Sequence, residues 1–168
     1  MKEQAIVIFI PNNKEINKIR KKYDKYYKKF KNHITLSYPF KIGNQKILNE
    51  HIENSIKSIK SFKIVLKELK KSKKDYYLYL LIKKGNKNIL KLYKNLHSKL
   101  LTKFKNKDMP KYIPHLTLGS FKTNLDINNA IKQIKYQNLS IKTKINEICL
   151  LTFKKGPEIE NIKRFNLK

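Results

Sequence analysis

The residues best suited to chemistry in this chain occur as two similar phrases: residues 33–36 read HITL and residues 115–118 read HLTL. In an extended strand, residues i and i+2 share a face, so each phrase presents its histidine and threonine on one side and two aliphatic side chains on the other. The chain has four histidines, and two of them falling into this pattern by chance is on the order of one in several thousand. We therefore predict that the two phrases build one functional site.

The four polar side chains match the needs of phosphodiester chemistry. Imidazole titrates at about pH 6.5, so one histidine of a facing pair can accept a proton while the other donates one. Threonine hydroxyls can donate hydrogen bonds to the non-bridging oxygens of a phosphate and stabilise the charge that develops in the transition state. We predict that His33 and His115 are the general acid and base, in an unassigned order, and that Thr35 and Thr117 bind the phosphate. This reaction needs no metal ion and no cofactor.

The histidines also have simpler interpretations. A strand histidine is ordinarily a polar residue satisfied at a sheet surface, and only the duplication favours a function for both copies. His51 and His97 lie in helical stretches without a threonine two residues later, so no role is predicted for them. A zinc site is disfavoured because neither phrase contains an Asp or Glu to complete the ligand set.

Apolar periodicity predicts the elements that position the phrases. The order strand, helix, His-Thr strand, helix, strand occurs twice, followed by a C-terminal strand pair with a hairpin at residues 154–157. This repeat predicts one α+β domain (residues 1–168) of two lobes, related by an approximate two-fold axis, with mostly antiparallel sheets lining a central cleft and helices outside. The lobes are predicted at residues 3–70 and 75–144, with the strand pair at 145–167. The expected strands cover residues 4–10, 33–39, 62–69, 76–82, 115–121 and 139 onward, and the expected helices cover 14–30, 44–60, 87–104 and 125–134.

The formal net charge of +28 favours an anionic substrate. The size of this charge is weaker evidence for nucleic-acid binding than it first suggests, because all the basic residues except Arg20 and Arg164 are lysines, a pattern typical of a low-GC genome. Apolar runs fall far short of the roughly 20 residues of a membrane helix, and the N-terminus lacks a signal-peptide pattern, so we expect a cytoplasmic protein without a membrane partner. Cys149 is expected to be a small buried apolar residue.

The paired phrases, their spacing and the opening AIVIFIPN resemble the 2H phosphoesterase superfamily, which includes RNA 2′,3′-cyclic phosphodiesterases and proteins named 2′-5′ RNA ligase-like. The longer phrases NHITLSYPF (residues 32–40) and YIPHLTLGSF (residues 112–121) are most similar to small stand-alone phosphoesterases of low-GC Gram-positive bacteria. The resemblance spans the whole chain. It implies a metal-independent enzyme with His33 and His115 as catalytic residues and phosphate held by the hydroxyls of Thr35 and Thr117.

One departure concerns recognition of the substrate. Members closest to the cyclic phosphodiesterases often carry an arginine shortly after the second phrase, where this chain reads GSF at residues 119–121. Recognition of an RNA end by such an arginine is therefore not implied, and Lys122 would offer only a point charge.

Aromatic residues near the phrases are candidates to stack a nucleobase. By strand alternation Phe121 shares the face of His115 and is predicted to bind substrate, whereas Tyr38 falls on the face opposite Thr35. The lysine- and tyrosine-rich residues 23–30 are interpreted as a solvated helix face, with contact to RNA as the alternative.

The leading functional hypothesis is a metal-independent phosphoesterase acting on a cyclic phosphate or a 2′-5′ phosphodiester. Its substrate would be an RNA end or a nucleotide, and the protein is expected to be a monomer. A reversible 2′-5′ RNA ligase and a non-catalytic RNA- or nucleotide-binding protein using the same cleft are the alternatives. Specificity is expected in three segments at the rim of the cleft, residues 41–46, 70–75 and 106–112, whose sequences do not indicate the substrate.

Overall fold

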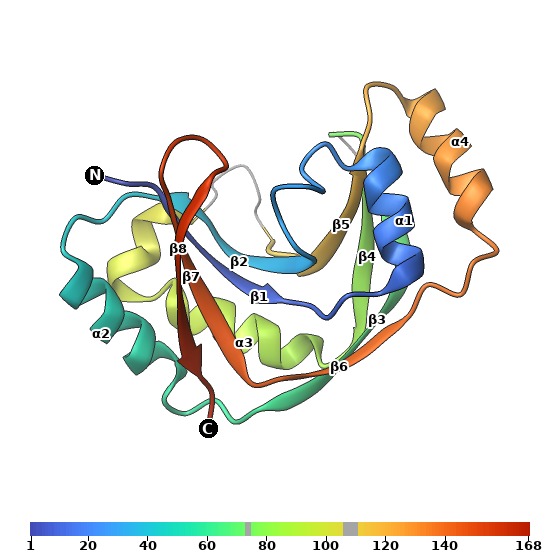
Figure 1. Cartoon of the computed structure of the whole chain (residues 1–168). Coiled ribbons are helices and arrows are strands. Elements are labelled where there is room, and N and C mark those ends of the chain that lie inside the picture. Colours follow the sequence, from blue (N-terminus) through green and yellow to red (C-terminus); the bar gives the residue numbers. More distant parts are fainter. Residues whose placement is uncertain (73–74, 106–110) are drawn as a thin grey trace.

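Eight strands form one curled sheet in the computed structural model, which describes residues 1–72, 75–105 and 111–168 (Figure 1). The order across the sheet is β6-β3-β4-β5-β2-β1-β7-β8, and every pairing among the described residues is antiparallel. Of the rim segments expected to set specificity, residues 73–74 and 106–110 lie outside the described part. The strands are β1 (Gln4–Phe9), β2 (His33–Phe40), β3 (Phe62–Lys71), β4 (Tyr77–Lys84), β5 (His115–Ser120), β6 (Ile141–Ile145), β7 (Glu147–Phe153) and β8 (Ile159–Asn166).

Side-chain caps start three of the helices. Asn13, Asn44 and Thr123 each accept a hydrogen bond from the backbone N–H three residues later, which satisfies one of the free donors of the first turn. The α1 helix packs against β5, α2 packs against α3, and α3 and η1 contact β2. No helix among the described residues is both long and apolar enough to cross a membrane. The helices are α1 (Lys14–Tyr23), α2 (Gln45–Ile56), α3 (Asn86–Leu96), the 3-10 helix η1 (Lys99–Phe104) and α4 (Asn124–Ile134).

The strand order divides the sheet into two halves that meet between β2 and β5. One half contains β2, β1, β7 and β8, and the other contains β5, β4, β3 and β6. The α+β class and the antiparallel sheet agree with the prediction, but the lobe boundaries do not. The predicted first lobe included residues 62–69, whereas β3 pairs with β4 and β6 in the other half, and the C-terminal pair of β7 and β8 completes the first half. The hydrophobic pattern locates a strand without specifying its partner.

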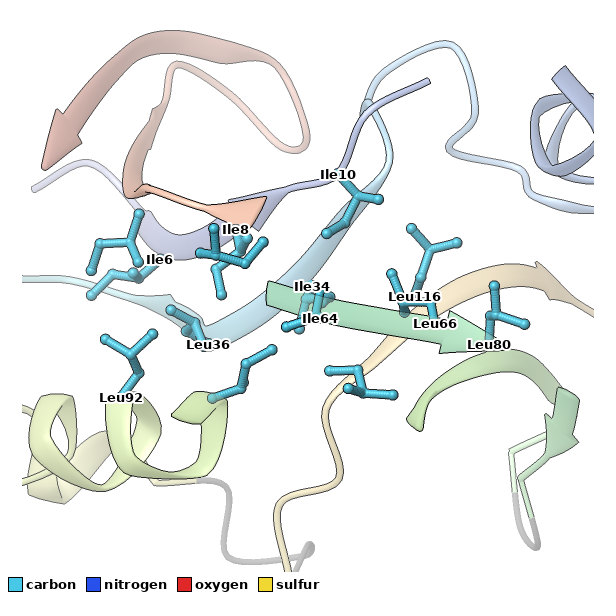
Figure 2. Close-up of a cluster of buried hydrophobic side chains, with 14 of the residues drawn as sticks. Ile6, Ile8, Ile10, Ile34, Leu36, Ile64, Leu66, Leu80, Leu92 and Leu116 are labelled. Carbon is cyan, nitrogen blue, oxygen red and sulfur yellow. The ribbon is translucent and has the colours of Figure 1, made fainter. Parts of the chain in front are cut away.

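The main core lies between the sheet and the helices. Ile34, Leu36, Leu116 and Leu118 are buried there, as predicted from the strand alternation. Figure 2 shows Ile34 and Leu36 of β2 in the same cluster as Leu92 of α3. A smaller cluster is built by residues of β1 and β7, and Cys149 is fully buried in it, in agreement with its predicted role. Since the aliphatic residues of both phrases point into the main core, their histidines and threonines project from the other face of the sheet.

Candidate active site

The two His-Thr phrases meet at the centre of the sheet. Ile34 of β2 is paired with Leu116 of β5, the one register pair between these strands in the described residues. In an antiparallel pair this register places His33 beside Thr117 and Thr35 beside His115. All four of these side chains line one cavity of about 670 Å³. The structure therefore brings the four predicted residues together in a crossed arrangement.

A buried tyrosine adds a second link between the phrases. The hydroxyl of Tyr112, three residues before His115, donates a hydrogen bond of 2.7 Å to the backbone carbonyl of Thr35. The Tyr112 ring stacks on Tyr93 of α3 with ring centroids 3.9 Å apart. The segment that leads into β5 is thus attached to both β2 and α3.

Both imidazoles are oriented in the same way. Nδ1 of His33 lies 2.8 Å from the carbonyl oxygen of Lys31, and Nδ1 of His115 lies 2.7 Å from the carbonyl oxygen of Ile113. A carbonyl oxygen only accepts hydrogen bonds, so Nδ1 carries the hydrogen in each ring. This leaves Nε2 of both neutral rings free to accept a proton.

The surroundings of both histidines disfavour the charged form. Burial lowers the pKa of His33 below its usual 6.5; the hydrogen bond to Lys31 opposes this shift, and the positive charge of Arg20 adds to it. Burial also lowers the pKa of His115, and a charge on His33 lowers it further. The two sites are therefore coupled, so that protonating one imidazole makes protonation of the other harder.

The structure reverses the predicted positions of Phe121 and Tyr38. One step along β4, from Leu78 to Tyr79, corresponds to two steps along β5, from Gly119 to Thr117, which is a β-bulge. Phe121 therefore lies outside the cavity lining and packs against the ring of Tyr23 of α1, with centroids 5.3 Å apart.

An equivalent bulge follows the first phrase. The step from Ile6 to Val7 in β1 corresponds to the step from Ser37 to Thr35 in β2. Beyond each bulge the two faces exchange, so Tyr38 and Ser120 line the cavity. A glycine at 119 inside a strand was the available sequence signal for a bulge.

The two sides of the cavity differ in chemistry. On the side of β1 and β7 the lining is apolar and includes Val7, Leu151 and Phe153. On the side of β4 it carries the phenols of Tyr77 and Tyr79, whose rings stack with centroids 6.1 Å apart. The sequence prediction missed these tyrosines, although their i, i+2 spacing in a strand places them on one face.

Each histidine also has an aromatic neighbour. The ring centroid of Tyr79 lies 3.9 Å from that of His115, and the centroid of Phe30 lies 5.7 Å from that of His33. Burial raises the pKa of Tyr79 to about 12, so its phenol keeps its proton at neutral pH. The aromatic contacts limit the orientations that the two imidazoles can adopt.

Comparisons with known proteins identify the family of this chain. The family model of the 2′-5′ RNA ligase superfamily matches residues 10–157.

This chain belongs to the 2′-5′ RNA ligase superfamily.

Two relatives described as "Putative phosphoesterase" come from Geobacillus. The protein of Geobacillus sp. (strain WCH70) is 28% identical over 141 residues, covering 80% of this chain and 78% of the relative. That of Geobacillus kaustophilus (strain HTA426) is 29% identical over 154 residues, covering 88% and 86%. These findings confirm the resemblance to the 2H phosphoesterases.

Solved structures share the fold. A crystal structure titled phosphoesterase superposes with a TM-score of 0.63 at 14% identity, covering 100% of this chain and 99% of the other. Escherichia coli LigT complexed with ATP superposes with a TM-score of 0.61 at 15% identity, covering 99% and 98%. The curled sheet of Figure 1 is therefore the architecture of known proteins.

This member of the 2′-5′ RNA ligase superfamily has a guanidinium at the cavity that the sequence prediction missed. Arg20 of α1 is 3% exposed and lines the cavity, but its nitrogens already bond to protein groups. They donate to the carboxylate of Asp24 at 2.6 Å, to Oδ1 of Asn32 at 2.7 Å and to the carbonyl oxygen of Phe30 at 3.0 Å. Arg20 thus fixes the segment before His33. Lys122, His51 and His97 are not among the described residues that line the cavity.

Proposed function

We propose that this chain is a metal-independent phosphoesterase that hydrolyses a cyclic phosphate or a 2′-5′ phosphodiester of RNA or a nucleotide. The observation that carries the proposal is the crossed arrangement of His33, Thr35, His115 and Thr117 around one cavity, in which Nε2 is the nitrogen of each neutral imidazole that can accept a proton. The relatives described as phosphoesterases and the structures of LigT with ATP and with 3′-AMP support it.

The proposed reaction uses one proton on the histidine pair. The lowered pKa values keep both imidazoles mostly neutral in the free protein, and the negative charge of an entering phosphate raises them, so one histidine takes up a proton. The neutral histidine accepts a proton from water as the water oxygen bonds to phosphorus. The protonated histidine donates its proton to the ribose oxygen as the bond from phosphorus to that oxygen breaks. The pair holds one proton before and after the step, with the two roles exchanged.

The threonines complete the site. The hydroxyls of Thr35 and Thr117 donate hydrogen bonds to the two non-bridging oxygens of the phosphate and hold it between the imidazoles. Because each threonine lies beside the histidine of the other strand, the phosphate is bound by both halves of the sheet. We propose no step that passes through a metal ion.

The two alternatives remain distinct hypotheses. A reversible 2′-5′ RNA ligase would use a ribose hydroxyl in place of water, and analysis of products formed in the presence of two RNA ends distinguishes it from a hydrolase. A non-catalytic RNA- or nucleotide-binding protein would bind phosphate in the cavity without turnover at any pH.

The test is hydrolysis of 2′,3′-cyclic nucleotides, of 2′-5′-linked dinucleotides and of a short RNA with a 2′,3′-cyclic phosphate end, in the presence of a chelator. We expect turnover by the wild type, and loss of at least about 100-fold in both His33→Ala and His115→Ala, because each histidine performs one proton transfer. His51→Gln, outside the cavity lining, is the matched control and keeps wild-type activity. The proposal fails if no substrate of the panel turns over, or if either alanine variant retains full activity.

A further inference from the structure

The segment between α1 and β2 differs from its prediction. The sequence pattern predicts a helix to residue 30, but α1 ends at Tyr23 and residues 25–29 form turns. The helix ends because Oδ1 of Asp24 accepts the N–H of Tyr26 while Oδ2 of Asp24 is held by Arg20. We call residues 24–32 the rim loop, which Figure 1 shows beside the start of β2.

The inner side of the rim loop is aromatic. Tyr26 and Phe30 both line the cavity that contains His33. The ring of Phe30 lies 5.7 Å from the imidazole of His33, and the ring of Tyr26 lies 6.1 Å from Phe30, measured between centroids. Tyr26 is 41% exposed. A series of aromatic rings thus leads from the proposed catalytic histidine to the surface.

The outer side of the rim loop is cationic. Four lysines of the loop are exposed, and none of them is paired with a carboxylate in the part of the chain that the structure describes. Asp24 is the one acidic residue of the loop, and Arg20 neutralises it. The ammonium of Lys25 lies 5.0 Å from the centroid of the Tyr26 ring, so a cation and an exposed aromatic ring adjoin. The four lysines are Lys25, Lys28, Lys29 and Lys31.

The rim loop is also held in place before any ligand binds. The guanidinium of Arg20 bonds to both ends of the loop, at Asp24 and at Asn32, and to the carbonyl oxygen of Phe30 between them. Phe30 additionally packs edge-to-face against Phe153 of β7. A preordered surface loses less conformational entropy on binding than a free loop does.

We propose that the rim loop binds a single-stranded oligonucleotide that continues from the phosphate at the two His-Thr pairs. In this arrangement the base next to the reacting nucleotide stacks on Tyr26, and phosphates further along the strand contact the lysines of the loop. Exposed aromatic rings beside cations are the usual means of binding a single strand without reading its sequence. The inference rests on the proposed phosphoesterase and names its substrate class, an oligonucleotide end rather than an isolated mononucleotide.

The first test is binding of a labelled six-nucleotide RNA with a 3′-phosphate, followed by fluorescence anisotropy from 50 to 200 mM salt. Each phosphate contact on a single strand contributes a slope of about 0.7 in log K against log salt, so the triple variant K25Q/K28Q/K29Q loses a slope of about 2. The ratio of the wild-type affinity to the affinity of this variant should therefore fall by roughly 16-fold as the salt concentration rises fourfold. The matched control is K87Q/K91Q/K94Q, which removes three exposed lysines of α3, a helix packed on the opposite face of β2.

The second test separates stacking from charge. Tyr26→Leu should lower kcat/KM for the RNA with a cyclic phosphate end by about tenfold and leave kcat/KM for a mononucleotide 2′,3′-cyclic phosphate unchanged, whereas Tyr26→Phe keeps the ring and the wild-type rate. The inference is overturned if the six-nucleotide RNA binds no more tightly than 3′-AMP, or if both triple variants behave alike. If no substrate turns over, the phosphoesterase proposal fails by itself, and the binding measurement alone decides on the rim loop.

Discussion

The buried ion pair between Arg20 and Asp24 offers the sharpest test of how the site is held. Replacing Arg20 with Met removes four donated hydrogen bonds: two to Asp24, one to Asn32 and one to Phe30. The Asp24 side chain is 8% exposed, so its carboxylate would be left buried without a counter-charge. Breaking a buried pair in this way costs about 3–5 kcal/mol, which is a large part of the free energy of unfolding of a typical domain.

A second substitution distinguishes this cause from lost packing. In R20M/D24N the buried charge is gone, and the side-chain amide oxygen introduced at position 24 can still accept the N–H of Tyr26. Replacement of both partners of a buried pair is often close to neutral, so we expect the double variant to recover most of the loss, to within about 2 kcal/mol of the wild type. Urea denaturation measures the free energy of unfolding of both variants relative to the wild type, provided that the m-value is unchanged.

The same variant should affect the proposed reaction. Arg20 holds the carbonyl oxygen of Phe30, whose ring packs on His33, and the next residue supplies the acceptor for Nδ1 of His33. Misplacing a reacting group by about 1 Å costs roughly 100-fold in rate, so R20M should lose activity even where it is fully folded. The reasoning is refuted if R20M loses less than about 1 kcal/mol, or if the double variant is no more stable than R20M.

Three further predictions concern other parts of the site. Since both histidines have a lowered pKa and the reaction needs one charged and one neutral ring, the pH profile of kcat/KM should peak below about pH 6.5, and a peak above pH 7 would contradict this. Because the folded state lowers both pKa values, His33 and His115 contribute stability above about pH 6.5 that is lost as pH falls through their folded-state pKa values. Chemical unfolding at several pH values measures this change in the free energy of unfolding. A Cβ at Gly119 would lie 2.6 Å from Cβ of Tyr23, so Gly119→Ala should destabilise the fold by about 1–3 kcal/mol in thermal or urea unfolding. Tyr79→Leu should lower kcat by removing the ring against His115, whereas Tyr79→Phe, which keeps that ring, should stay within a few-fold of the wild type in steady-state assays.

Much of the site was predictable because its signal is local. Alternation within four residues already places Ile34 and Leu116 in the core and the neighbouring histidines on the opposite face. Phe121 and Tyr38 were misplaced because a single extra residue in each strand exchanges the two faces, and alternation carries no information about such a bulge.

Other features were missed because they depend on specific side-chain bonds or on how the strands assemble, which apolar periodicity does not indicate. The end of α1 at Tyr23 depends on the hydrogen bonds of Arg20 to Asp24 and Asn32, which cannot be predicted from the helix propensities of single residues. Similarly, the pattern of residues 62–69 identifies a strand, but its pairing with β4 and β6 is decided by the assembled sheet. The family resemblance rested on the two phrases, whereas the cavity walls around them are formed by residues from several segments that only the folded chain brings together.

In the chain, the strands β3 to β6 of one half lie between β2 and β7 of the other half, and this order affects folding during synthesis. The half that contains β3, β4, β5 and β6 is continuous in the chain and can pair its strands as soon as residue 145 has left the ribosome. The half that carries His33 pairs β1 with β7, and that contact awaits residues 147–153. During this interval β1 has one unpaired edge, which exposes backbone groups to other chains. Nascent chains ending before β7 should therefore be the aggregation-prone species, and the cavity wall beside His33 is completed only when residues 147–153 have paired with β1.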